Sequence, residues 1–301
     1  MNPADITAAV LEALGPVTDQ LPEAKWRDAA EADRVAVRST TVAITCAAAA
    51  ALDGDDEFVA RPAIAGPGAT GAVLDRLLLG PLDPQRAGGP SDPGSAFREV
   101  LQHPPEQWAW EWASREASRE EKALLSGVVS RRIAGIARML QPWPPPDVTQ
   151  AGRRLPWTHP SRPLRLHGSG EVTLGKRDGT HTVVAVLTGD HTGATRDRLA
   201  YEAVVEVLSV RRVPAVVRGL LPDAGRDWSV RVDDDLLATG VAAIATAART
   251  ALGVVRRDAA GLARQPSPAC RRCAHQVGCT EGETWLAGPG RLRLGFLPPL
   301  A

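Results

Sequence analysis

The chain has 301 residues, enough for one large domain or two smaller ones, and its 35 Lys and Arg residues are matched by 35 Asp and Glu residues. This balance excludes a strong overall basic field of the kind that draws proteins to nucleic acid, while leaving room for local basic surfaces. The first 15 residues contain Asp5 and no basic residue, and the longest apolar run, residues 40–52, is shorter than the roughly 20 residues of a membrane span. We therefore expect a soluble, cytoplasmic protein with no signal peptide and no membrane partner.

The first half of the chain predicts helices separated by Gly- and Pro-rich loops. Residues 1–52 carry apolar positions at helical spacing in two segments, ITAAVLEALG and VAVRSTTVAITCAAAAALDG, and each is expected to be a helix. A short helical stretch, TGAVLDRLLLG, follows between loops at residues 53–70 and 80–95. Residues 106–140 form the clearest helical region, which the Pro-rich sequence QPWPPPD ends.

The hydrophobic period changes after residue 150. Four segments bounded by Gly and Asp are typical of strands, and one segment among them is typical of a helix. The strands are RLHGSGEVTLG, THTVVAVLTG, VPAVVRGLL and DWSVRVD, and the helix is RDRLAYEAVVEVLSV. Residues 234–262 return to helix. This order predicts an α/β fold with a mixed sheet flanked by helices. We expect a helical region over residues 1–150 and an α/β core with the cysteine segment over residues 151–301, together forming one compact unit.

Three of the four cysteines stand close together, as Cys270-x2-Cys273-x5-Cys279. In a reducing cytosol, clustered cysteines are more often metal ligands than disulfides. Three thiolates leave one position of a tetrahedral zinc site or of a 4Fe–4S cluster to be filled. Cys46 is the natural fourth ligand, which would tie distant parts of the chain together, and His275 is the alternative within the loop. Cys46 could equally be a small buried residue on an Ala-rich helix.

The cysteine pattern and the order of elements resemble those of a known group. The motifs VRSTTVAITCAAAA, GATGAVLDRLLLG and LHGSGEVTLG, followed by the cysteine triplet, are similar to those of the iron–sulfur branch of the PD-(D/E)XK nucleases. That branch includes the RecB-like nucleases, the AddB subunits of recombination helicase–nucleases and the CRISPR-adaptation exonucleases. The resemblance covers residues 35–285 and is strongest over residues 165–282. It implies a restriction-endonuclease-like core in which a 4Fe–4S cluster, held by Cys46, Cys270, Cys273 and Cys279, forms a C-terminal staple.

The catalytic positions implied by the resemblance are largely altered. The family places a carboxylate on one strand and an Asp or Glu, one residue, and a Lys on the next, so that the acids hold Mg²⁺ over the scissile phosphate. Glu171 in GSGE stands at the first position, whereas VVAVLTG has Ala185 at the second acid and Leu187 at the Lys. Asp75 stands where the family has a metal-binding His, and Tyr201 keeps its family character.

Three functions are compatible with this pattern. The leading one is a catalytically degenerate nuclease fold that binds DNA or scaffolds a DNA repair, recombination or defence complex. The second is an active Mg²⁺-dependent DNA exonuclease or endonuclease with rearranged ligands, for which Asp190 and Lys176 are nearby in the sequence. The third is a zinc-stapled protein-interaction domain. The chain has no helicase motif, so a helicase or ATPase, if one is used, would be a separate protein partner.

Two further groups of residues are candidates for binding. His181 and His191 flank the predicted central strand and are expected to be solvated turn residues. The local Arg clusters in SRRIAGIAR and SVRRVPAVVR could contact phosphates, or could be solvated faces beside the acidic VDDDLL segment.

Overall fold

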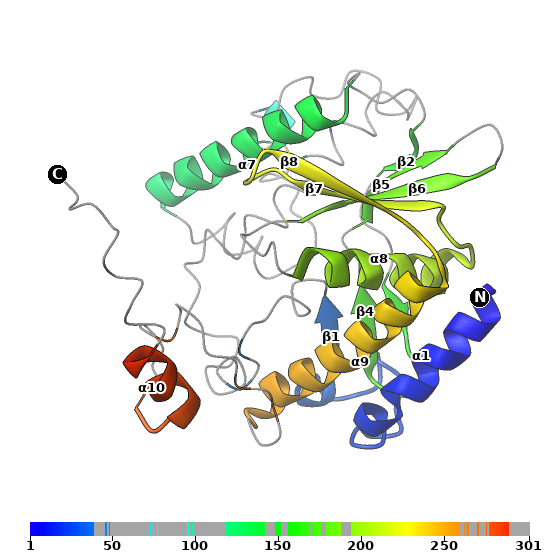
Figure 1. Cartoon of the computed structure of the whole chain (residues 1–301), viewed down its shortest axis with the longest axis vertical. Helices are drawn as coiled ribbons and strands as arrows, with labels where there is room; N and C mark the ends of the chain where they lie inside the picture. The colour runs from blue at the N-terminus through cyan, green and yellow to red at the C-terminus, as the bar shows by residue number, and fades with distance from the viewer. Residues whose placement is uncertain are drawn as a thin grey trace.

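The structure, a computed structural model of the whole chain, is an α/β fold with two mixed sheets flanked by helices (Figure 1). The described residues are 1–38, 46, 48, 73, 77, 95, 96, 98, 118–141, 148–151, 156–168, 170–175, 179–187, 194–258, 262, 264, 270, 275 and 277–288. The predicted fold class is confirmed at the level of an α/β protein with mixed sheets and helical flanks.

The larger sheet has five strands in the order β2-β5-β6-β7-β8. Its strands are β2 (Val148–Ala151), β5 (Gly170–Gly175), β6 (His181–Val186), β7 (Val216–Leu221) and β8 (Arg226–Arg231). β5 pairs antiparallel with both β2 and β6, β6 and β7 are parallel, and β7 and β8 form an antiparallel hairpin. The parallel pair requires a crossover connection, which helix α8 (Thr195–Val210) provides.

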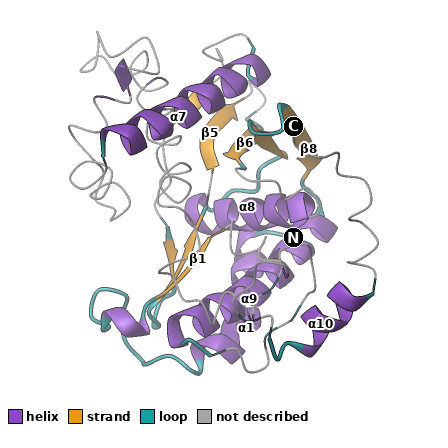
Figure 2. Cartoon of the chain, turned by 90° about the vertical axis from the view of Figure 1, so that its left-hand side faces the viewer, coloured by secondary structure: helices purple, strands orange, loops and turns teal. Residues whose placement is uncertain are grey.

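Helices cover both faces of this sheet. α8 lies on one face, and α7 (Arg119–Met139) lies on the other (Figure 1 and Figure 2). This arrangement explains why β6 reads as a nearly continuous apolar run instead of an alternating one, because a strand covered on both faces must bury both sets of side chains. Val183 and Ala185 belong to the core shared with α8, while Val184, between them in the strand, is also fully buried.

The smaller sheet has three strands in the order β1-β4-β3, which are β1 (Val35–Arg38), β4 (Leu164–His167) and β3 (Trp157–Thr158). β1 runs parallel to β4, and β3 runs antiparallel to it. Our expectation of a helix that includes VAVR was therefore wrong. The two valines are β-branched and alternate with less buried residues, which favours a strand. The hydrogen-bond partners of this strand are backbone groups of β4, which the local sequence does not reveal.

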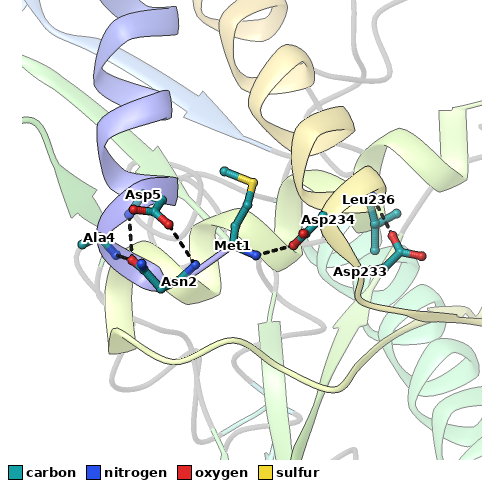
Figure 3. Close-up of polar contacts among 7 residues, drawn as sticks. All are labelled: Met1, Asn2, Ala4, Asp5, Asp233, Asp234 and Leu236. Atoms are coloured by element: carbon teal, nitrogen blue, oxygen red, sulfur yellow. Dashed lines mark hydrogen bonds and ion pairs between the residues drawn. The ribbon is translucent and has the colours of Figure 1, made fainter.

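Helices α1 (Pro3–Thr18) and α9 (Asp234–Arg256) pack beside each other, and α9 packs on β1 of the smaller sheet. Each begins at a capping side chain: Asn2 accepts hydrogen bonds from the amides of Ala4 and Asp5, and Asp233 accepts one from Leu236 (Figure 3). The Met1 amino group contacts the Asp234 carboxylate and so joins the starts of the two helices.

α9 is long and apolar enough to cross a membrane if length and composition are the only criteria. In the fold it contacts α8, α1 and β1, and its apolar side chains, among them Leu236, Leu237 and Ile244, belong to the hydrophobic core. One face of the helix is therefore packed against the rest of the fold, and the other is exposed. The sequence prediction of a helix over 234–262 is confirmed up to Arg256, where Arg257 adopts the left-handed conformation and ends the helix.

α7 is fastened to the β7–β8 hairpin. Arg132 donates two hydrogen bonds of 2.9 Å to the carboxylate of Asp223, in the turn between the strands. Arg218, on β7, donates to Met139 O at the last residue of α7 (2.7 Å) and to Asp227 on β8 (2.7 Å). α7 ends at Met139, immediately before the Pro-rich segment, as predicted from the sequence. The first part of the predicted helix, residues 106–117, lies outside the described residues.

A close helix–helix contact occurs at Gly240 of α9, and it generates a stability prediction. A Cβ atom at this position would lie 2.3 Å from Ala200 O and 2.7 Å from Val204 Cγ2 on α8. We expect Gly240→Ala to lower the free energy of unfolding by about 1–3 kcal/mol, because α8 and α9 would have to move apart. Urea denaturation followed by circular dichroism measures this change.

Gly127→Ala is the matched control, since Gly127 is exposed in the middle of α7 and has no heavy atom within 4 Å of its Cβ position. The same substitution there should raise the free energy of unfolding by about 0.5–1 kcal/mol through helix propensity. A free energy of unfolding that is unchanged or raised in Gly240→Ala would contradict the close α8–α9 packing.

Candidate functional site

The structure describes some of the predicted site residues and leaves others out. The backbone of Glu171 and the whole of Ala185, Leu187 and Tyr201 are described. Asp75 lies outside the described residues, as do Cys273, Lys176, Asp190 and His191. The nuclease-like positions can therefore be compared at four residues, and the cysteine site at three.

Glu171 stands at a break in the register between β5 and β6. Gly170 pairs with Ala185 and Val172 pairs with Val184, so Glu171 is an extra residue between two successive pairs. Such bulges redirect side chains and are frequent beside functional sites. The backbone thus places the predicted first acid position next to Ala185, which stands at the predicted second one.

Ala185 and Leu187 are both completely buried in the hydrophobic core. Leu187 follows the last residue of β6 and its amide donates to Leu220 O (2.8 Å) on β7. Its Cδ1 atom lies 2.8 Å, and Leu199 Cδ2 lies 2.9 Å, from the point at which Gly219 would carry a Cβ atom. An apolar contact between β7, α8 and the end of β6 therefore fills the space beside the position where the family has its Lys.

The chemical consequence is that positions 185 and 187 cannot supply a carboxylate ligand or an ammonium group. A metal-dependent hydrolase holds its ion with carboxylates and needs a group that stabilises charge or moves a proton. The side chains of Ala185 and Leu187 can neither bind a metal ion nor carry charge or a transferable proton. An ammonium or carboxylate introduced at these two buried positions would lose its hydration and would be costly to accommodate.

Tyr201 joins α8 to the smaller sheet. Its hydroxyl lies 2.9 Å from Val37 O on β1 and 3.1 Å from His167 O on β4, so two carbonyl acceptors share one proton. Complete burial, and secondarily the negative charge of Glu202, raises the pKa of Tyr201 well above its ordinary value. The hydroxyl therefore stays protonated and acts as a donor, and its role in the described structure is to connect two strands and a helix.

Cys270 and Cys279 face the same small volume beside Gly282. Cys279 Sγ lies 3.4 Å, and Cys270 Sγ 3.8 Å, from the point at which Gly282 would carry a Cβ atom. The two sulfur atoms are therefore no further apart than the sum of these distances. Gly282 is buried, and because it has no side chain the volume next to both sulfurs is left open to a ligand. Two soft sulfur donors in this arrangement suit zinc or an iron–sulfur cluster.

A tight turn positions Cys279 at the start of helix α10 (Thr280–Ala287). Gly278 has φ of 84°, in the left-handed region that glycine adopts at no steric cost, and its amide donates to Glu283 Oε1 (3.0 Å) in the first turn of the helix. Arg264 forms an ion pair with Glu281 (3.6 Å), which connects the preceding segment to the same helix. These contacts hold the Cys279 side chain at one end of α10.

The fourth cysteine is not joined to this pair in the described structure. Cys46 is half-buried, and no group of three His, Cys, Asp or Glu side chains among the described residues could hold a metal ion. Cys273, which belongs to the same triplet as Cys270 and Cys279, lies outside those residues. The assignments of Cys46 and Cys273 as ligands therefore stay predictions.

The sequence did not reveal a row of buried charges on α8. Arg198, Glu202 and Glu206 repeat every four residues, so they share one face of the helix, and each is only 2% exposed. His181, which we expected to be a solvated turn residue, is instead the first residue of β6 and is buried with its Nε2 atom 3.2 Å from Glu206 Oε1. The sequence did contain a signal for this row: charged residues repeat every four positions within a largely apolar helix. A largely apolar helix is covered on most sides, so charges on it are expected to be buried as well.

Comparison with protein-family models and with curated proteins finds no match for this chain. A function for the protein must therefore be inferred from the geometry of the site and from the resemblance carried by its motifs.

The contact at Tyr201 leads to a second stability prediction. We expect Tyr201→Phe to lower the free energy of unfolding by about 1–3 kcal/mol, because the carbonyls of Val37 and His167 lose a buried donor. Thermal and urea denaturation measure the change. If Tyr201→Phe were as stable as the original chain, the hydroxyl would not be the connection between α8 and the two strands.

Proposed function

We propose that this protein is a catalytically degenerate member of the iron–sulfur PD-(D/E)XK nucleases, which binds DNA or scaffolds a DNA repair, recombination or defence complex. A restriction-endonuclease-like core and a C-terminal cysteine staple are parts of this proposal. The order of elements supports it: the β5–β6 hairpin, helix α8 and the parallel strand β7 follow one another as the resemblance implies.

The observation that carries the proposal is the burial of Leu187. A functional Lys at this position would have to place its ammonium group where Leu187 instead packs with Leu199 beside Gly219. With Ala185 equally buried, two of the three positions of the catalytic motif belong to the apolar core. We propose that the surrounding strands and helix are those of the nuclease core, used for binding and no longer for hydrolysis.

The cysteines support the second part of the proposal. Cys270 and Cys279 face one volume, and we propose that Cys273 and Cys46 complete a ligand set for a 4Fe–4S cluster. Such a cluster would act as a structural crosslink, tying the segment around α10 to the N-terminal half of the chain. Zinc is the alternative occupant of the same sulfur ligands.

Location and partners follow from this chemistry. Thiolates that hold a metal centre require a reducing compartment, so we propose a cytoplasmic protein. A role in DNA processing would require a separate helicase or ATPase, because the chain itself has no helicase motif. The protein partner would then supply the motor and the present chain a binding surface.

Metal analysis of anaerobically purified protein tests the cluster. We expect a brown protein with about four irons per chain and a matching amount of sulfide. Substitution of Cys46, Cys270, Cys273 or Cys279 by Ser should each reduce the iron content and the visible absorbance. Val277→Ser is the matched control, because Val277 lies in the same loop and is 93% exposed, and it should leave both unchanged.

A colourless protein that holds one zinc ion, and retains it in Cys46→Ser, would contradict the iron–sulfur proposal. It would favour a zinc-stapled interaction domain instead. That result would also remove Cys46 from the ligand set and leave the connection between the two ends of the chain unsupported.

A nuclease assay tests the loss of catalysis. We expect no degradation of linear single- or double-stranded DNA by the metal-loaded protein in the presence of Mg²⁺ or Mn²⁺, since Ala185 and Leu187 offer no ligand or base. Glu171→Ala should therefore behave as the original chain. Metal-dependent cleavage that Glu171→Ala abolishes would instead identify an active nuclease with rearranged ligands.

A further inference from the structure

A cluster of arginines around Trp26 forms a second surface, separate from the cysteines and from the altered catalytic positions. We call it the Trp26 patch and define it by Trp26, Arg27, Arg34 and Arg165. Arg165 lies on β4 between Leu164 and Leu166, both of which are fully buried. Because side chains alternate along a strand, Arg165 faces the opposite side of the small sheet from the core, away from α9.

Trp26 holds two of these arginines in place. The Arg165 guanidinium carbon lies 4.3 Å from the centre of the Trp26 ring, and that of Arg34 lies 5.9 Å from the same point. Both distances are within the range of cation–π attraction. The two guanidinium groups are therefore gathered around one aromatic side chain, although 131 positions of sequence separate Arg34 from Arg165.

The remaining contacts of the patch orient the arginines without neutralising them. Arg165 Nε donates to Thr158 Oγ1 (3.2 Å) on β3, and a terminal nitrogen of Arg34 donates to Arg27 O (3.4 Å). Among the described residues, no carboxylate forms an ion pair with Arg27, Arg34 or Arg165. Asp28 and Asp33, in the same segment, likewise form none with them. The arginines therefore keep their positive charge and most of their donors.

The charges of the patch act on one another. Partial burial, and then the positive charges of Arg27 and Arg34, lowers the pKa of Arg165. Like charges held together in this way raise the free energy of the fold, and an anion that binds between them removes that cost. Arg132 and Arg218 differ from the arginines of the patch, because each pairs with an Asp and so has a structural role, fastening α7 or β8.

We propose that the Trp26 patch binds the phosphodiester backbone of single-stranded DNA. This inference rests on the proposed function in DNA processing and assigns it a surface. Arg guanidinium groups match phosphate oxygens in geometry and charge, and neighbouring arginines can each donate hydrogen bonds to one phosphate of the same strand. Trp26 is half-buried and stands among the arginines, and an aromatic side chain can stack with an unpaired base, which a single strand offers and a duplex does not.

Fluorescence anisotropy with a labelled 12-nucleotide oligothymidylate tests the inference on the metal-loaded full chain. We expect the double variant Arg34→Gln, Arg165→Gln to bind about tenfold more weakly than the original chain at low salt. The dependence of binding on salt concentration should also fall, by about one unit of the log–log slope for each phosphate that the variant no longer neutralises. Circular dichroism checks that the variant is folded.

Two further variants keep the test decisive. If the double variant fails to fold, Arg27→Gln takes its place. It removes an exposed charge from the patch without disturbing the contacts to Trp26, and it should also weaken binding. Arg131→Gln, Arg138→Gln is the matched control, since both residues are exposed on α7 in the Arg cluster that the sequence made conspicuous. It should change the affinity less than threefold.

The outcomes separate this inference from the proposed function. Unchanged binding by the patch variants would overturn the inference and leave a DNA-binding role at another surface. That surface would be α7 if the Arg131→Gln, Arg138→Gln variant lost affinity. No binding by the original chain would overturn the inference and the DNA-binding form of the proposed function, and would leave only the scaffold form. Equal binding of a 12-residue polyglutamate, or tighter binding of a 12-base-pair duplex, would replace single-stranded DNA with a general anion or with duplex as the ligand.

Discussion

Helix α8 is covered on almost every side, and this burial is the constraint on which the rest of the fold depends. Twelve of its 16 residues are buried. One side packs on β6 and β7, another packs on α9, and Tyr201 connects it to β1 and β4. A helix in this position must be largely apolar, so the charged residues that it does bury need partners close by. His181 and Glu206 meet this requirement across the interface between β6 and α8.

The same constraint acts at the end of β6, where the proposed nuclease relationship would require a charged side chain. Here Leu187 extends the α8 interface to the very end of that strand, and Gly219 on β7 makes space for it. Under the proposed relationship, the Leu at this position goes together with close packing between the strand end and the helix, and a Lys introduced there would have its charge in apolar surroundings.

The sequence predicted the elements whose signals are local. The β-branched runs of β6 and β7, the apolar periods of α8 and α9, and the Pro-rich end of α7 were all recognisable. β1 was missed because VAVR leads into an Ala-rich segment and its strand partner, β4, follows more than 120 positions later. Cys270 and Cys279 stand within one short segment of the sequence, and in the structure both face the volume beside Gly282. The Trp26 patch had no local signal, because Arg165 joins Arg34 only through the pairing of β1 with β4.

Strand β8 has a consequence for the behaviour of the protein in concentrated solution. It lies at the edge of the five-stranded sheet, and nearly all of its residues are exposed, including Trp228. Such an edge can recruit a strand from another molecule and start aggregation. Arg226, Asp227 and Arg231 place charges along this edge, and a second copy approaching in register would have to desolvate them. The charges therefore protect the exposed Trp228 from unwanted self-association.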